Sequence, residues 1–292
     1  MYNNIDLQAL LFRAQAILKL NDLGASTKPS PKLYPHQWNW DSAFIALGLS
    51  HSNPHRAQLE IRSMLHAQWE TGMIPHIVFN PEAVNYHPGP EYWHTEIPAA
   101  PKTIRTSGIT QPPVFAQAAL GLYNNSLKSD ADLAFLSEIY PALLREADFL
   151  YRDRDPKGEG LSYICHPWES GMDNSPCWDK PLNHFSMDFK PDFMRKDNQS
   201  IPMDQRPSDS EYTRYSYLVQ RYALEEWVQT KILKLDLFLL QSVLFNVLQL
   251  ESMHALAEIA KIIKVSTDII DQRILRGRDS FENKLWDDDS KR

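Results

Sequence analysis

The chain has 292 residues, 43% of them hydrophobic, and a formal net charge of -7. That length and composition suit a globular protein with a sizeable core. The negative charge and the absence of a Lys/Arg cluster exclude the usual nucleic-acid binders, and the most apolar stretch, Leu235 to Leu250, is too short to cross a bilayer and contains Asp236.

Apolar residues recur at helical spacing along most of the chain. The predicted helices, in chain order, are Ile5–Leu20, Asp41–Leu49, Pro54–Trp69, Gln111–Leu127, Leu133–Arg152, Tyr212–Gln229, Leu237–Lys264 and Thr267–Leu285. Pro112 and Pro113 are expected in the first turn of their helix, and Pro141 predicts a kink or a break. The segment Leu237–Lys264 is long enough for one helix or two.

Convincing strands are few, so the sequence predicts an all-α protein. Its helices are joined by two connections much longer than usual, at Thr71–Thr110 and Gly158–Ser210. These connections hold most of the Trp, Tyr, His and Pro residues. Loops of such length are usually functional, so they are where a site is expected.

The first polar and aromatic segment runs from Tyr34 to Ser42 as Tyr-Pro-His-Gln-Trp-Asn-Trp-Asp-Ser. Sugars stack their C–H faces on indoles, and a carboxylate accepts hydrogen bonds from their hydroxyl pairs. The segment therefore suggests sugar binding. The alternative is that Asp41 only caps the helix that follows, beside a hydrophobic staple.

Two further segments are less specific. Gly72–Ile77 and Tyr86–Pro90 predict a rigid, non-helical path that displays Tyr86, His87 and Trp93, or simply surface turns. Thr106–Pro113 places Gln111 at the mouth of a helix, as a hydrogen-bonding partner for a substrate or as a cap.

The most specific segment is His166–Asp179, which reads His-Pro-Trp-Glu-Ser-Gly-Met-Asp-Asn-Ser-Pro-Cys-Trp-Asp. A general acid for glycosidic cleavage needs a carboxyl group that keeps its proton in a partly apolar setting. Glu169 and Asp173, between two tryptophans, both fit. A calcium loop that uses Glu169, Asp173, Asn174 and Asp179 is the rival interpretation, although the spacing is not that of an EF-hand.

These segments together resemble a known family. YPHQWNWDSAF, TGMIPHIVF, YHPGP with Trp93, TSGITQPP, HPWESGMDNSPCWD and RPSDSEYTRYSYL occur in the order found in the bacterial mannosylglycerate and glucosylglycerate hydrolases. Those enzymes belong to glycoside hydrolase family 63, with trehalase-like relatives. The resemblance runs from about Leu33 to the C-terminus. It implies an (α/α)6 toroid and hydrolysis with inversion, without a cofactor or a metal.

The resemblance also assigns roles to residues. By its position in the W-E-S-G-x-D motif, Asp173 corresponds to the general acid. The residues that correspond to the hexose subsite are Tyr34, Trp38, Asp41, Gln111 and Trp168. Those that correspond to contacts with the glycerate end are Tyr86, Arg206 and Tyr212, and an arginine fork is suited to a carboxylate.

One departure from the family pattern bears on activity. The family's general base is a Glu in an E-Y-F motif, followed by an F-S-W-T segment, and neither occurs in this sequence. Residues 1–292 are therefore expected to form the N-terminal and central part of one (α/α)6 domain, without its C-terminal helices, and to be inactive alone. The expected partners are a small carbohydrate substrate and either further copies of the same chain, in a homo-oligomer, or a complementing C-terminal fragment.

Two other functions stay open on the same scaffold. They are an oligosaccharide α-glucosidase or trehalase-like enzyme, and a non-catalytic sugar-binding remnant. The compartment is expected to be the cytoplasm, because Met1 to Gln8 show no signal-peptide pattern. Cys165 and Cys177 are expected to be reduced, with a disulfide between them as the alternative.

Overall fold

A computed structural model describes residues 6–31, 33–83, 86–193, 195–196, 202 and 206–289. Its longer helices are α1 (Leu7–Leu20), α2 (Asn39–Ser50), α3 (Pro54–His66), α5 (Phe115–Asn125), α6 (Asp130–Asp153), α8 (Asp209–Leu224), α10 (Val243–Ile262) and α11 (Asp268–Ser280). The short ones are α4 (Pro90–Trp93), α7 (Asp179–His184) and α9 (Gln229–Ile232). The two strands β1 (Gln37–Trp38) and β2 (Ile77–Val78) pair antiparallel.

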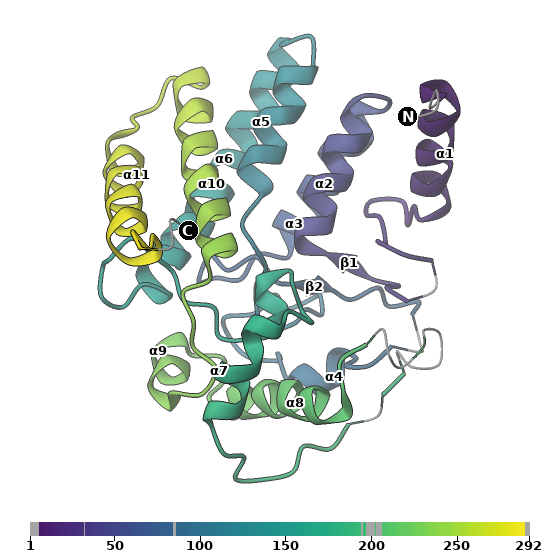
Figure 1. Ribbon diagram of the computed structural model, residues 1–292. Coiled ribbons are helices and arrows are strands. Elements are labelled where there is room, and N and C mark those ends of the chain that lie inside the picture. Colours follow the sequence, from purple (N-terminus) through teal and green to yellow (C-terminus); the bar gives the residue numbers. More distant parts are fainter. Residues whose placement is uncertain are drawn as a thin grey trace.

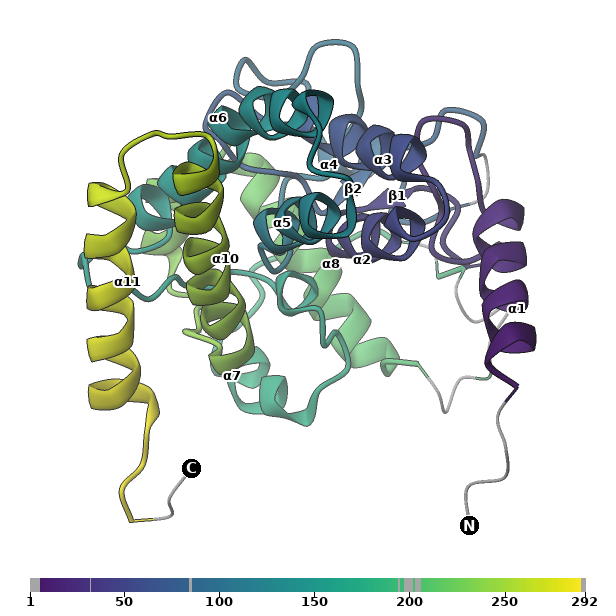
Figure 2. The same ribbon diagram turned by 90° about the horizontal axis from the view of Figure 1, so that it is seen from above.

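The long helices form two rows. Seen from above, α2, α5 and α10 lie in an inner row and α3, α6 and α11 in an outer row, with α1 standing beside α2 at one end (Figure 2). Each inner helix contacts the outer helix that follows it in the sequence, and α5 contacts both α2 and α10. The result is an open arc of helical hairpins, in agreement with the toroid that the family resemblance implies.

The long connections gather below this arc (Figure 1). They carry α4, α7 and β2, and α8, α9 and β1 lie on the same side of the arc. The protein has two apolar cores, one for the arc and one for the part below it. One lies between the helices of the arc and includes Phe115 and Leu136. The other lies in the connections and is rich in aromatic residues, among them Trp38, Trp93 and Trp168.

Five of the longer helices, α1, α3, α6, α8 and α10, begin where a polar side chain satisfies free backbone N–H groups. The Asn53 side chain accepts from Arg56 N (3.1 Å) at the start of α3. Ser129 and Asp132 form a reciprocal capping box at the start of α6. These local signals explain why the predicted helices exist and why most begin near the predicted residue.

Several predicted boundaries were wrong. Pro112 and Pro113 precede α5 instead of forming its first turn, because a residue before proline favours an extended backbone. Pro141 does not break α6, which runs through it as one helix. Tyr212–Gln229 is not one helix, since α8 ends at Leu224 and a turn with positive φ at Glu226 follows.

The other expectations concern residues 237–264, the two cysteines, the start of the first helix and membrane spans. Residues 237–242 are not helical, and the segment after them forms a single helix, α10. Both cysteines are free, Cys165 buried and Cys177 exposed. Ile5, the predicted start of the first helix, lies outside the described residues. In the described parts of the chain, no helix has the length and apolar character needed to cross a membrane.

Candidate active site

A pocket lies where the N-terminal end of α2 meets the connections. Its cavity volume is about 140 Å³. Its lining residues come from four stretches of the chain, 29–41, 76, 111 and 171–173: Pro29, Tyr34, Trp38, Trp40, Asp41, His76, Gln111, Gly171 and Asp173. Five residues predicted for substrate contact or catalysis, from Tyr34 to Asp173, are therefore in one place.

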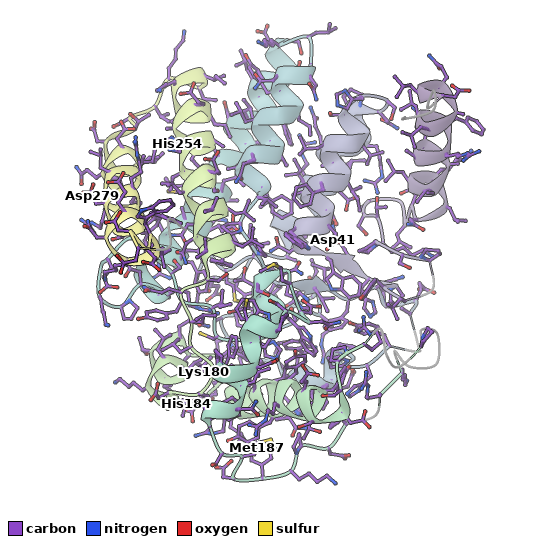
Figure 3. The ribbon with its side chains drawn as sticks, in the orientation of Figure 1. Asp41, Lys180, His184, Met187, His254 and Asp279 are labelled. Carbon is purple, nitrogen blue, oxygen red and sulfur yellow. The ribbon has the colours of Figure 1, made fainter. Side chains whose placement is uncertain are left out.

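The wall contributed by β1 and α2 is fixed through the backbone. Asn39 N donates to His76 O (3.0 Å), which joins the start of α2 to the residue after Pro75. Gln111 Oε1 accepts from Trp40 N (3.3 Å) in the first turn of α2. Gln111 thus caps α2 and lines the pocket as well. Asp41 is the third residue of α2, so it is not the N-cap of that helix. Figure 3 shows Asp41 at the lower end of α2.

The loop that carries Asp173 is held on both sides. Tyr215 Oη donates to the Asp173 carbonyl oxygen (2.8 Å), and Trp178 Nε1 donates to Met172 O (2.7 Å). Gly171 has φ +72°, and a Cβ added there would lie 2.5 Å from the Trp40 ring. Only glycine therefore allows the loop to approach Trp40 so closely.

The sequence left both Glu169 and Asp173 as candidates for the general acid, and the structure gives them different surroundings. Glu169 is fully buried, and both its oxygens accept from the Arg154 guanidinium, at 2.6 and 2.8 Å. Burial alone would raise the pKa of Glu169, but Arg154 and the backbone N–H groups of Cys165 and Thr110 hold it below its ordinary value. Glu169 is thus a buried, ionised partner of Arg154 and does not line the pocket.

Asp173 has the opposite environment. Burial raises its pKa to about 7; Arg206 opposes this shift and Asp41 adds to it. Burial also raises the pKa of Asp41 to about 6, opposed by a backbone hydrogen bond. A carboxyl group that keeps its proton near neutral pH can donate it to a leaving oxygen. The pKa of Asp41 is raised less, which favours the ionised form of that group more than at Asp173.

His76 lines the same pocket, although it was only one of several scattered histidines in the sequence. Its ring is 5% exposed and stacks on Trp168 at 6.2 Å between centroids. Burial lowers its pKa to about 3, with His166 adding to the effect, so the ring is neutral. Its Nδ1 has no hydrogen-bond partner among the described residues. His76 belongs to the TGMIPHIVF segment of the family resemblance, but no role was predicted for it; its position after the rigid Pro75 is the signal that was available.

Trp168, predicted for the hexose subsite, does not line the pocket. It lies behind His76 and contacts the Tyr212 ring at 6.2 Å and the Tyr215 ring at 5.7 Å. In the structure Trp168 supports the pocket wall by packing against His76.

Tyr86, Arg206 and Tyr212 lie beside the pocket, on its Tyr34 side. The Tyr86 ring packs edge-on against Trp38 at 5.5 Å. Arg206 Nη1 donates to Tyr34 Oη (3.4 Å). Burial raises the pKa of Tyr86 well above its ordinary value, with Tyr212, Tyr34 and then Asp173 adding to the shift. The phenols, the guanidinium and the acid are thus close enough to act on one another.

The calcium interpretation does not hold. The Glu169 oxygens are occupied by Arg154. Over the described ranges, no group of three or more His, Cys, Asp or Glu side chains is arranged to hold a metal ion.

Comparison with known proteins identifies the family of this chain. The model of the mannosylglycerate hydrolase MGH1-like glycoside hydrolase domain matches residues 34–292. Mannosylglycerate hydrolase from Rubrobacter radiotolerans is 41% identical over 95% of this chain and 64% of its own length. Glucosylglycerate hydrolase from Mycolicibacterium hassiacum is 39% identical over 87% of this chain and 59% of its own.

A solved structure shows the same similarity to the mannosylglycerate hydrolases in three dimensions. The family 63 mannosylglycerate hydrolase from Thermus thermophilus, in complex with Tris and D-glycerate, superposes with a TM-score of 0.90 at 37% identity. That superposition covers 96% of this chain and 66% of the other. The chain thus spans less than two thirds of the length of these relatives. It belongs to the mannosylglycerate hydrolase MGH1-like family of glycoside hydrolase domains.

Proposed function

We propose that this chain supplies the hexose subsite and the general acid of an inverting glycoside hydrolase for small α-linked sugar acids, such as glucosylglycerate and mannosylglycerate. The observation that carries the proposal is the pairing of Asp41 and Asp173 in one aromatic-walled pocket. The pKa of Asp173, raised by burial to about 7, suits proton donation, and the lower value for Asp41 suits hydroxyl binding.

Tyr34, Trp38 and Gln111 would hold the hexose beside Asp41. The two aromatic rings meet edge to face at 5.0 Å and so form a corner in the wall. A pyranose ring stacks on such a surface through its C–H groups, while the Gln111 amide offers a fixed dipole. Asp173 would then protonate the glycosidic oxygen as the bond breaks.

Arg206, Tyr86 and Tyr212 would receive the glycerate end. The support is the hydrogen bond from Arg206 to Tyr34, which places a guanidinium at the edge of the hexose pocket. A guanidinium pairs with a carboxylate through two parallel hydrogen bonds. The relative from Thermus thermophilus was solved with D-glycerate bound.

The general base is proposed to come from polypeptide beyond these 292 residues. An inverting enzyme keeps its two carboxyl groups roughly 6.5–9.5 Å apart to admit water. Within the described part of the pocket, Asp41 is the one other carboxylate, and hexose binding occupies it. Residues 1–292 are thus proposed as the N-terminal and central part of one (α/α)6 domain, with little or no turnover alone.

The partner that completes the domain is proposed to be the family's remaining helices, in the same chain or as a separate fragment. Large apolar side chains on α1 are more than half exposed: Leu7, Leu10, Leu11, Phe12, Ile17 and Leu20. Such a face needs cover. A second copy of the chain is the alternative, and its signature is a dimer at micromolar concentration.

Calorimetry with glucosylglycerate and mannosylglycerate, followed by NMR analysis of products, tests the proposal. We expect binding without appreciable hydrolysis, and Asp41→Asn should weaken binding. Turnover at the rate of the relatives would contradict the proposal that residues 1–292 lack the general base. Absence of binding would contradict the hexose pocket. Preferential binding of trehalose would favour the trehalase-like alternative instead.

A further inference from the structure

The buried carboxylate of Glu60 on α3 gathers an unusual number of hydrogen bonds. It is 0% exposed. It accepts from Thr27 N (3.2 Å), Thr27 Oγ1 (2.8 Å), Gln37 Nε2 (3.0 Å), Ser42 Oγ (2.7 Å) and Arg56 Nη1 (2.9 Å). These donors come from the N-terminal loop, β1, α2 and α3, so one side chain joins four segments of the chain.

The donors adjoin the pocket. Gln37 immediately precedes Trp38, and Ser42 immediately follows Asp41. The threonine donor lies two residues before Pro29. Trp38, Asp41 and Pro29 all line the pocket. Each of these three donors therefore has a pocket residue within two positions.

The local geometry explains how the donors and the pocket residues face opposite ways. Successive side chains of a strand point to opposite faces, so Gln37 turns toward Glu60 when Trp38 turns toward the pocket. Successive residues of a helix are rotated by about 100°. Ser42 can therefore reach Glu60 while its neighbour Asp41 lines the cavity.

The charge of Glu60 is balanced inside the network. Arg56 donates to Glu60 and also to Asp22 Oδ1 (3.0 Å) and Thr27 Oγ1 (2.8 Å). Gln37 is further held by Ser63 Oγ, which donates to its Oε1 at 2.9 Å. A fully satisfied buried network fixes its members in one arrangement, because each alternative leaves a polar group unpaired.

We propose that Glu60 is a positioning residue for sugar binding, which sets Trp38 and Asp41 at the spacing that a hexose requires. It does not line the pocket and takes no part in proton transfer. The inference rests on the proposed hexose-binding function. It adds that hexose affinity depends on a residue of α3 that never touches the sugar.

The test uses the full chain with Glu60→Gln, a change of nearly equal volume that replaces an acceptor-only group with an amide. We expect hexose affinity, measured by calorimetry, to fall roughly tenfold or more. The 19F resonance of fluorotryptophan at position 38, assigned with Trp38→Phe, should shift in the sugar-free protein.

A matched control separates positioning from loss of stability. Asn53→Ala removes the cap of the same helix, α3; the Asn53 side chain accepts only from the backbone N of Arg56 and contacts no side chain of the Glu60 network. It should lower the melting temperature while leaving hexose affinity and the position-38 resonance unchanged. If Asn53→Ala weakened binding as much as Glu60→Gln, the effect would be one of stability and the inference would be overturned.

Ser42→Ala provides a second variant if Glu60→Gln does not fold. It removes one donor on the Asp41 side, and we expect a loss of affinity of roughly threefold to tenfold. Unchanged affinity in Ser42→Ala, or an unmoved resonance in Glu60→Gln, would overturn the inference. If the unmodified chain bound no hexose, the proposed function would fail, and the resonance alone would decide whether Glu60 positions Trp38.

Discussion

Two carboxyl groups four residues apart show how environment divides roles at the scale of single residues. Glu169 is ionised because Arg154 pairs with it inside the protein. At Asp173 the effect of burial outweighs the opposing effect of Arg206, so the neutral form of the carboxyl group is favoured. Sequence patterns do not show this difference, because Arg154 lies fifteen residues before Glu169, just after the end of α6.

The raised pKa of Asp173 predicts a pH-dependent cost in stability. As pH rises from about 4 to 7, the unfolded chain loses this proton first, since the pKa rises from 3.8 to about 7 on folding. Stability is therefore lost over that range. Asp173→Asn should be more stable than the unmodified chain at pH 8 and nearly equal to it at pH 4. Urea unfolding at both pH values measures this; an equal difference at the two would contradict it.

Arg206→Ala should act on one end of the substrate only. Loss of the guanidinium should weaken binding of glucosylglycerate or D-glycerate by roughly tenfold to a hundredfold, as expected for a charge-assisted pair. Binding of the free hexose should fall far less, because Tyr34 loses one hydrogen bond to Arg206 and keeps its packing against Trp38. Calorimetry with the three ligands gives the comparison. An equal loss for free hexose would place Arg206 in the hexose subsite instead.

The site residues could be predicted from the sequence to different degrees. Tyr34, Trp38 and Asp41 stand in one short segment, and they line the pocket together. His76 lies outside that segment, and its backbone is held beside the pocket by hydrogen bonds to Asn39 N and Ile109 O. Trp168 has the right motif but lies one layer behind, which depends on how its loop folds back.

At the scale of elements, prolines account for two of the differences between expectation and structure. Pro141 lies inside α6, where packing of its apolar neighbours against α5 and α10 maintains the helix. The predicted start of α5 was four residues early, because Pro112 and Pro113 hold an extended path that delivers Gln111 to α2. Propensity alone does not contain these tertiary contacts.

Gly171 offers a test of how the acid loop meets α2. Gly171→Ala should destabilise the protein and weaken hexose binding, because the new Cβ would meet the Trp40 ring. Gly158→Ala is the matched control: it also has a positive φ (+65°), but its nearest neighbour is 4.0 Å away. The control should cost about 1 kcal/mol of backbone strain without affecting binding. Equal effects of the two on hexose affinity would contradict a role for the Trp40 contact.

At the scale of the whole molecule, the arc of helices is the feature that the family predicted and local patterns did not. Periodicity indicated helices, whereas their two-row order came from the resemblance and is visible in Figure 2. The superposition with the Thermus thermophilus relative agrees with that order. The two ends of the arc, at α1 and α11, lie apart in the same view.

Because α1 is exposed, substitutions on α1 should lower the free energy of unfolding less than substitutions in the core of the arc. Leu11→Lys should cost less than about 0.5 kcal/mol, because the side chain is 51% exposed and none of the residues of α1 is buried. Leu136→Ala on α6, at 0% exposure, should cost about 2–5 kcal/mol. Leu11→Lys should also reduce any self-association seen by light scattering. A large loss of stability in Leu11→Lys would show that α1 is packed in solution.

The central claim is that Asp173 donates the proton in a site that another part of the domain completes. The direct measurement joins the C-terminal third of the Rubrobacter radiotolerans relative to residues 1–292 and follows mannosylglycerate hydrolysis by NMR. We predict hydrolysis with inversion in the joined protein, and a loss of about 10²–10⁴-fold in Asp173→Asn with substrate affinity retained. Hydrolysis within tenfold of the parent in a folded Asp173→Asn variant would contradict the account.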